Sequence, residues 1–347
     1  MHVVFRTDAS ETIGSGHLMR CLLLADAIVQ SGGKCSFIIR NRNIVTDRLL
    51  KNCSHDVFFL NLLEVVNQVE DALQSIKCMK NILPSVDWVV VDHYGIDAKW
   101  EALIRVRTKH ILVIDDLANR FHECDVLVDP GYGRKSLDYN CLLSPQTLQL
   151  LGPKYAILHP SFALSHASAP LWPELRRVHI FFGGGTSAKW LGSCIESIME
   201  VEHDIEILAL GFCDEQVMAN LQKKIGGKLE WSRYEMEMVK HYARCSLAVG
   251  SPGTATWERA CMGIPSAVVA TAENQIPILK KLDQLGLCRY LGPASELQTT
   301  ELRENLRAFF QDDISRSHMR ATGLAAVDGK GTERILRNLL EKSQSDA

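Results

Sequence analysis

A histidine next to a glycine-rich turn is the residue of this chain best placed to do chemistry. His17 directly follows Gly14-Ser15-Gly16, which lies between a short apolar strand and a helix that begins at about Gly16. Glycines let a backbone pass close to a ligand, and free N–H groups at a helix start favour an anion such as a diphosphate. The helix dipole disfavours an imidazolium there, so His17 is expected to act as a general base for water. A nearby carboxylate such as Asp8 would instead favour the imidazolium. The alternative is that His17 only caps the helix and has no catalytic role.

Polar residues also follow three apolar strands predicted in the first half of the chain. They are Asp92-His93-Tyr94 after residues 87–91, Asp115-Asp116 after 110–114, and Asp129 after 125–128. Open α/β sheets bind ligands at the carboxyl ends of their strands, so this edge is a candidate site. Ordinary turns and caps explain the same residues. No His or Cys completes a transition-metal set, and we expect no metal.

Glycine-rich turns follow two strands predicted in the second half. One turn contains Gly184 and leads into Gly185-Thr186-Ser187; the other begins at Gly250. The second turn and the helix after it supply candidate nucleotide-binding residues, namely Ser251, Gly253, Thr254, Thr256 and Glu258. Thr254 or Thr256 is expected to cap the helix, and Glu258 to accept hydrogen bonds from a ribose. The alternative for Glu258 is a surface glutamate favoured by the helix dipole.

The first glycine turn does not complete a dinucleotide fingerprint. Arg20 does not supply the third glycine, and the second strand ends in Arg40 instead of an acidic residue. The phosphate-loop pattern that ends in Gly-Lys-Ser/Thr is absent from the sequence. An NADP site remains an alternative.

Strands and helices alternate through both halves of the sequence, which is typical of parallel sheets covered by helices. We predict an α/β protein with two Rossmann-like domains facing a cleft. Residues 133–175 are the least regular part, and their Ser/Ala/Pro-rich end suits a linker. The predicted domains are 1–168 and 169–347, with a last helix over 331–342 that crosses back to the first domain.

Composition restricts the class of protein. The 347 residues are 46% hydrophobic and 23% charged with a net charge of −3, which gives no reason to expect nucleic acid or an anionic membrane as partner. No apolar run is long enough to span a membrane, and Met1 leads into a strand instead of a basic signal region. The eleven cysteines form no CxxC motif. We therefore expect a cytoplasmic protein.

Six motifs in order along the chain resemble one known family. They are FRTDASETIGSGHLMRCLLLAD, VVDHYGIDAKWE, FFGGG, SPGTATWERACMGIPS, AENQ and DGKGTERI. The family is the UDP-2,4-diacetamido-2,4,6-trideoxy-β-L-altropyranose hydrolases of pseudaminic acid biosynthesis, a pathway of cell-surface glycans and flagellin glycosylation. The resemblance implies a GT-B fold similar to that of the glycosyltransferase MurG, with UDP held mainly by the C-terminal domain.

The resemblance also implies roles for individual residues. His17 matches the family's histidine that activates water for attack at the anomeric carbon, and Tyr94 and Asp8 match residues of its DHYG element and first loop. Glu258 matches the ribose-binding glutamate. Asn274 and Gln275 match an element near the sugar or phosphates. Two turns depart from the family: Gly185-Thr186-Ser187 stands where Asp is frequent, and the turn at 251–253 has fewer glycines.

The resulting hypothesis is hydrolysis of a UDP-sugar by water attack at C1, by a monomer without a cofactor. Gly14 and Gly16 would then face the sugar and place His17 and a water against the anomeric carbon. Two other classes remain: a GT-B glycosyltransferase that uses a UDP-sugar, and a non-catalytic nucleotide-sugar or NADP-binding protein.

Overall fold

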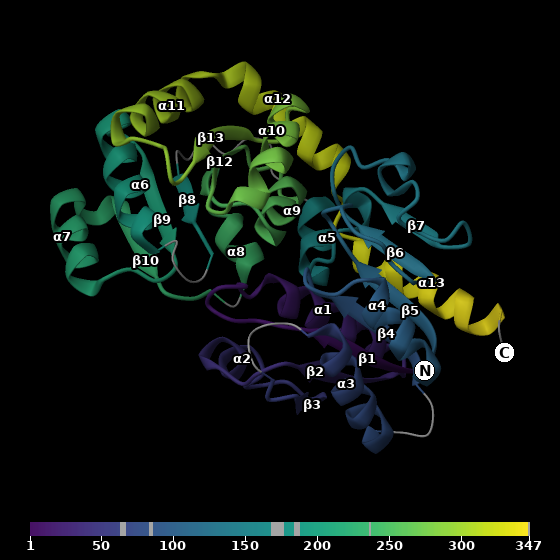
Figure 1. The fold of residues 1–347 in the computed structure, drawn as a ribbon. Helices are drawn as coiled ribbons and strands as arrows, with labels where there is room; N and C mark the ends of the chain where they lie inside the picture. The colour runs from purple at the N-terminus through teal and green to yellow at the C-terminus, as the bar shows by residue number, and fades with distance from the viewer. Residues whose placement is uncertain (63–66, 83–85, 168–176, 184–187, 236, 346–347) are drawn as a thin grey trace. The chain divides into compact units, whose positions relative to one another are not determined.

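The chain separates into two compact units in a computed structural model (Figure 1). Unit 1 comprises residues 1–158 and 330–347, and unit 2 comprises residues 159–329. The structure describes residues 1–62, 67–82, 86–167, 177–183, 188–235 and 237–345. Each unit contains one parallel sheet covered by helices, which confirms the predicted α/β class with two Rossmann-like folds.

Unit 1 is built on a seven-stranded sheet with the order β3-β2-β1-β4-β5-β6-β7. Its strands are β1 (His2–Thr7), β2 (Lys34–Ile39), β3 (Asp56–Phe59), β4 (Val86–Asp92), β5 (Thr108–Ile114), β6 (Val126–Asp129) and β7 (Leu148–Leu151). Its helices are α1 (Gly16–Gln30), α2 (Ile44–Leu49), α3 (Gln68–Ile82), α4 (Ala98–Ile104) and α13 (Gly331–Ser345). All pairings among these strands are parallel.

Alternate residues of each central strand in unit 1 bury opposite faces of the sheet. On β4, Trp88 and Val90 pack in the same core as α1 and α13, whereas Val89 and Val91 pack with α3 and α4. Burial on both faces explains why these strands are almost continuously apolar.

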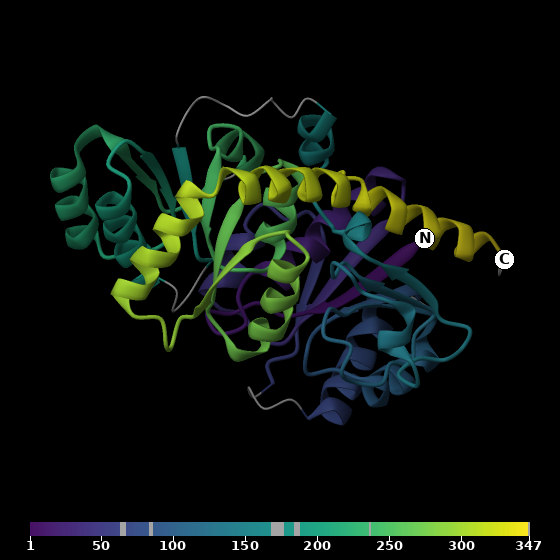
Figure 2. The ribbon, with the colours of Figure 1, turned by 90° about the horizontal axis from the view of Figure 1, so that it is seen from above.

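Helix α13 completes unit 1 although its residues follow unit 2 in the sequence. Ile335 and Leu339 are fully buried in the core beside α1. The Trp88 indole donates a 2.8 Å hydrogen bond to the Ser343 hydroxyl, and Figure 2 shows the last turns of α13 near the N-terminus.

Unit 2 has a six-stranded parallel sheet with the order β10-β9-β8-β11-β12-β13. Its strands are β8 (Arg177–Phe181), β9 (Glu206–Leu210), β10 (Leu229–Ser232), β11 (Leu247–Gly250), β12 (Ser266–Ala270) and β13 (Arg289–Pro293). Its helices are α5 (Pro160–Ala167), α6 (Ala188–Val201), α7 (Glu215–Ile225), α8 (Met238–Tyr242), α9 (Thr254–Cys261), α10 (Ile276–Gln284), α11 (Thr299–Gln311) and α12 (Asp313–Ala326).

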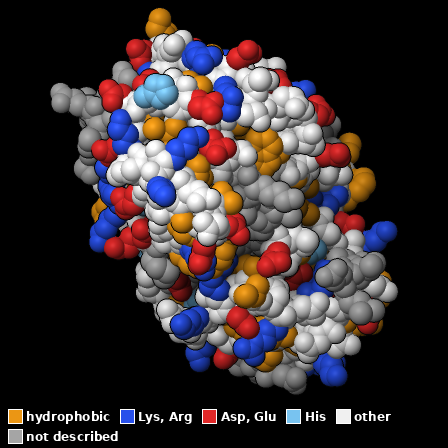
Figure 3. Space-filling model, turned by 90° about the vertical axis from the view of Figure 1, so that its left-hand side faces the viewer, with side chains coloured by type: hydrophobic (Ala, Val, Ile, Leu, Met, Phe, Trp, Pro, Cys, Tyr) orange, Lys and Arg blue, Asp and Glu red, His pale blue; other side chains and the backbone are white. Residues whose placement is uncertain are grey.

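The surface of the described residues carries both signs of charge. Figure 3 shows acidic and basic side chains interspersed over the face that it presents. Among the described residues, no helix has the length and apolar character required to cross a membrane.

Candidate functional site

The switch point of the unit 1 sheet gathers the candidate residues of the first half. Chain order reverses between β1 and β4, and a crevice forms outside the carboxyl ends of such strands. His17 follows β1, whereas Asp92 ends β4 and Tyr94 follows it. Tertiary structure thus brings together groups that are far apart in sequence.

His17 is hydrogen-bonded to Asp92. The distance from His17 Nδ1 to Asp92 Oδ1 is 2.6 Å, and the Asp92 side chain is fully buried. Burial alone would raise the pKa of Asp92, but the adjacent Arg20 guanidinium and His17 hold this pKa well below its usual range. Because the ionised carboxylate can only accept, Nδ1 of His17 donates to it, and in the neutral imidazole the lone pair is therefore on Nε2. The pair therefore has the geometry of a general base oriented by a carboxylate.

Arg20 binds the same carboxylate from one turn further along α1. Its Nε and Nη2 atoms donate to Asp92 Oδ2 and Oδ1 at 2.5 and 2.6 Å. Its Nη1 lies 3.4 Å from Asp116 Oδ2. Arg20 thus joins two carboxylates beside His17.

Tyr94 lies against His17 and is held by Asp116. The two rings meet edge to face with centroids 4.6 Å apart, and the Tyr94 hydroxyl donates to Asp116 Oδ1 at 2.8 Å. Burial and the Asp116 carboxylate raise the pKa of Tyr94, so the phenol keeps its proton. Tyr94 as a whole residue remains 39% exposed, which leaves a surface available to a ligand.

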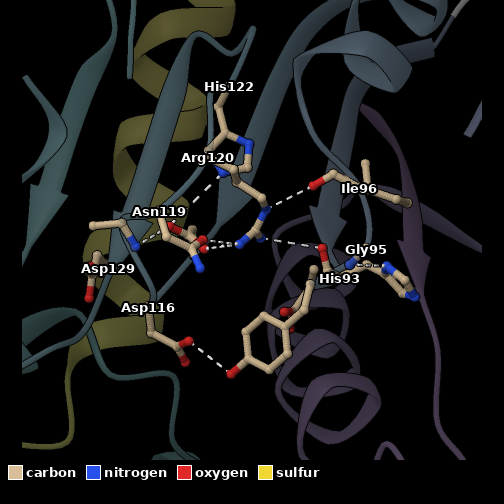
Figure 4. Close-up of polar contacts among 12 residues, drawn as sticks. His93, Gly95, Ile96, Asp116, Asn119, Arg120, His122 and Asp129 are labelled. Carbon is tan, nitrogen blue, oxygen red and sulfur yellow. Dashed lines mark hydrogen bonds and ion pairs between the residues drawn. The ribbon is translucent and has the colours of Figure 1, made fainter. Parts of the chain in front are cut away.

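Arg120 fixes the turn that carries Tyr94 (Figure 4). Its Nε donates to the Ile96 carbonyl at 2.9 Å, and its Nη2 to the His93 carbonyl at 3.4 Å. Its guanidinium also lies 5.9 Å from the centre of the Tyr94 ring and 2.9 Å from Asp115 Oδ1. This turn is therefore held from both sides of Tyr94.

Asp8 lies in a separate buried ion-pair network. Its carboxylate accepts from Arg6 Nη1 at 2.7 Å and from the Arg40 backbone at 2.7 Å, and it lies 3.1 Å from His93 Nε2. Despite burial, Arg6 and His93 hold the pKa of Asp8 below its usual range. The carboxylate that contacts His17 is thus Asp92, which corrects the expectation that Asp8 would be its neighbour.

The turn before α1 has the features predicted for an anion-accepting helix start. Gly14 has a positive φ of 85° and its N–H bonds back to the Ser10 carbonyl at 2.8 Å. Ser15, the N-cap residue, makes no side-chain capping bond, and Gly16 is exposed. The first turn of the helix therefore lacks a side-chain cap at its N–H groups.

The second glycine turn of unit 2 also lies at a switch point, between β8 and β11. A Cβ at Gly250 would lie 2.0 Å from the Phe181 carbonyl oxygen, so only glycine fits there. Gly253, with φ of 107°, is the N-cap of α9, and no side-chain capping bond to this helix is found among the residues that the structure describes. The predicted capping by Thr254 or Thr256 is therefore wrong. Ser251 and Thr256 are buried beside the turn.

Glu258 is half-buried on α9 and is bonded to Tyr242, whose hydroxyl donates to its Oε2 at 3.1 Å. Burial raises the pKa of Glu258 above its usual value, partly opposed by Tyr242 and Arg259. Within the described residues, no side chain or backbone group is hydrogen-bonded to its second oxygen. That oxygen is available to accept a ligand hydroxyl.

The remaining candidates of unit 2 lie in the turn after β12. Asn274 is exposed. The Gln275 oxygen accepts from the Thr271 and Ala272 backbone at 2.8 and 3.3 Å, so this residue shapes its own turn and presents only its amide nitrogen. Gly184 and the Gly185-Thr186-Ser187 turn lie outside the described residues.

Comparison with solved structures defines the fold class. The chain is similar to MurG from Acinetobacter baumannii, with a TM-score of 0.70 and 15% identity over 98% of this chain and 99% of that one. It is also similar to UDP-GlcNAc 2-epimerase from Neisseria meningitidis, solved with UDP-GlcNAc, with a TM-score of 0.63 and 11% identity over 98% and 100%. The fold is GT-B, as predicted from the sequence.

Two proteins are similar to this chain in sequence. The spore coat polysaccharide biosynthesis protein SpsG of Bacillus subtilis is 23% identical over 353 residues, which cover 99% of each chain. The UDP-2,4-diacetamido-2,4,6-trideoxy-β-L-altropyranose hydrolase of Campylobacter jejuni is 26% identical over 165 residues, covering 47% of this chain and 53% of that protein. No protein-family model matches the chain.

Proposed function

We propose that this protein hydrolyses a UDP-linked diacetamido-trideoxy sugar, UDP-2,4-diacetamido-2,4,6-trideoxy-β-L-altropyranose, to UDP and the free sugar. The observation that carries this proposal is the 2.6 Å contact between His17 and a buried, ionised Asp92, which leaves Nε2 as the proton acceptor. Similarity to the Campylobacter jejuni hydrolase supports the substrate. The reaction would belong to pseudaminic acid biosynthesis.

In the proposed mechanism, His17 Nε2 removes a proton from water while the water oxygen bonds to C1 of the sugar. The bond between C1 and the phosphate oxygen breaks, and UDP leaves as a stable anion that needs no strong acid. Asp92 stabilises the imidazolium that forms. General-base catalysis of this kind contributes about 10²- to 10⁴-fold in rate. Asp8 would act only through His93 and the turn that carries Tyr94.

Nucleotide binding is proposed for unit 2. The diphosphate would lie at the turns that contain Gly184, Ser251 and Gly253, near the uncapped start of α9 with Thr254 and Thr256. Glu258 would bind the ribose, and Asn274 and Gln275 would lie near the phosphates or sugar. The turn with Gly14 and Gly16 would face the sugar. A monomer in the cytoplasm, with no cofactor, remains the prediction.

Hydrolysis in ¹⁸O-labelled water tests the proposal. A panel of UDP-sugars is incubated with the protein, and mass spectrometry identifies the sugar and locates the label. We expect label on the sugar; label in UDP would contradict attack at C1. A His17→Asn protein should bind UDP normally and lose about 10²-fold or more in turnover, and near-normal turnover would remove His17 from its role.

A glycosyltransferase is the second candidate, because the chain shares its fold with MurG. The same His17–Asp92 pair would then deprotonate an acceptor hydroxyl instead of water. UDP release without any acceptor distinguishes the two functions: a hydrolase turns over repeatedly, whereas a transferase needs an acceptor.

A further inference from the structure

Five side chains of unit 1 form a closed ring of contacts, named here the polar ring: His17, Asp92, Arg20, Asp116 and Tyr94. His17 contacts Asp92, and Arg20 joins Asp92 to Asp116. Asp116 accepts from the Tyr94 hydroxyl, and the Tyr94 ring meets the His17 ring edge to face. The ring connects α1, the end of β4 and the loop after β5.

We infer that Arg20 is the positioning residue of this site, because among the described residues it alone links the carboxylate that orients His17 to the carboxylate that holds Tyr94. This inference rests on the proposed function. The planar guanidinium donates in two directions at once, with Nε and Nη2 on Asp92 and Nη1 towards Asp116. A lysine ammonium cannot reproduce that fork.

Arg20 also contacts the His17 ring directly. The groups that face the pair are Arg20 from α1, Asp92 from β4, and Asp116 and Tyr94 from the following loops, with the Cys21 thiol 3.6 Å from Asp92 and Arg120 over the Tyr94 ring. Arg20 Nη2 lies only 3.2 Å from His17 Nδ1. Arg20 and Asp92 thus both contact the same ring nitrogen, Nδ1, so Arg20 also restrains the orientation of the imidazole.

Two substitutions test the positioning role. Arg20→Lys keeps the charge but breaks the fork; we expect kcat to fall about tenfold while KM stays unchanged. Arg20→Met removes every donor of the fork; we expect kcat/KM to fall about 100-fold. The control is Arg105→Lys, because Arg105 also joins two carboxylates, Asp125 and Glu123, but outside the polar ring.

A double-mutant cycle tests the link to Tyr94. Arg20→Lys and Asp116→Asn break the same bridge, so their effects on kcat should be strongly non-additive. Additive effects would overturn the link, as would wild-type kcat in Arg20→Lys or wild-type kcat/KM in Arg20→Met.

Imidazole ¹⁵N NMR of the free protein provides a readout independent of turnover. We expect the Nδ1–H tautomer of His17 in the wild type, and a mixture of tautomers in Arg20→Met. An unchanged His17 signal in that variant overturns the inference even if the protein proves not to be a hydrolase. If the protein hydrolyses no UDP-sugar but the His17 signal changes as expected in Arg20→Met, only the proposed function is refuted.

Discussion

Replacement of Asp92 by Asn tests the site most directly, because it preserves shape and removes one charge. Asp92 is fully buried and binds His17 at 2.6 Å and Arg20 at 2.5 Å. A hydrogen bond to a charged group is worth about 1.5–3 kcal/mol, which corresponds to roughly 10- to 150-fold in kcat/KM. The free energy of unfolding should also fall by about 3 kcal/mol. This value is at the low end for breaking a buried ion pair, because Arg20 retains its contact with the Asp116 carboxylate.

The assay measures kcat/KM from UDP release, at a temperature where circular dichroism shows the variant to be folded. The matched control is Asp87→Asn at the other end of β4, where the carboxylate accepts from the His2 backbone at 2.8 Å and contacts Lys109 at 3.1 Å. The control should keep normal kcat/KM. A folded Asp92→Asn protein with kcat/KM close to that of the wild type would refute the assignment of His17 as a carboxylate-oriented base.

Three other substitutions address the remaining parts of the structure. Glu258→Gln should raise the Kd for UDP about tenfold in calorimetry, because a carboxylate that accepts ribose hydroxyls becomes a weaker amide acceptor. Asp8→Asn should lower the free energy of unfolding in urea by about 3–5 kcal/mol, because Arg6 loses a buried partner. Because the folded-state pKa of Asp8 is far below its unfolded value of about 4, its contribution is fully present above about pH 4 and declines progressively as the pH falls below that value, so this deficit should shrink in acid. Gly250→Ala should prevent unit 2 from folding, because its Cβ would meet the Phe181 carbonyl.

Each of these substitutions has a matched control in the same unit. Glu215→Gln, at an exposed position in the first turn of α7, should leave the Kd for UDP unchanged. Asp47→Asn should lower the free energy of unfolding little, because its ion pair with Arg42 is exposed. Gly227→Ala meets open space and should fold. The respective reasoning fails if Glu258→Gln binds UDP normally, if the Asp8→Asn deficit is equal at pH 3 and pH 7, or if Gly250→Ala folds with wild-type stability.

Most of the fold could be predicted because central parallel strands are buried on both faces. The run DWVVV can be recognised as a buried strand without knowing which strands pair with it, and it forms most of β4. Strand β7, in a stretch predicted to be irregular, was missed because it pairs on one side only and its residue Leu148 is exposed. Strand β13 was missed as well, since Gly292 and Pro293 weaken its strand pattern.

The location of the candidate site could be predicted from the sequence, but the hydrogen bonds between its side chains could not. His17 and the Asp92-His93-Tyr94 cluster were both recognised, yet the bond between His17 and Asp92 spans 75 residues and exists only in the folded sheet. In the sequence, Arg20 stands where a dinucleotide fingerprint would require a glycine. Its spacing of three residues from His17 also places the two side chains on the same face of α1, and this spacing could have indicated their contact. The N-cap of α9 was predicted wrongly because it is Gly253, a residue with positive φ and no side chain, instead of a threonine whose hydroxyl could cap the helix.

Helix α13 has a consequence for the order in which the chain can fold. During synthesis, all seven strands of unit 1 and the whole of unit 2 emerge before residues 331–345 do. Until then, the core beside α1 lacks Ile335 and Leu339, and the Trp88 indole lacks its bond to Ser343. Unit 2, whose residues are contiguous, can reach its native state first, whereas the half that contains His17 is completed last.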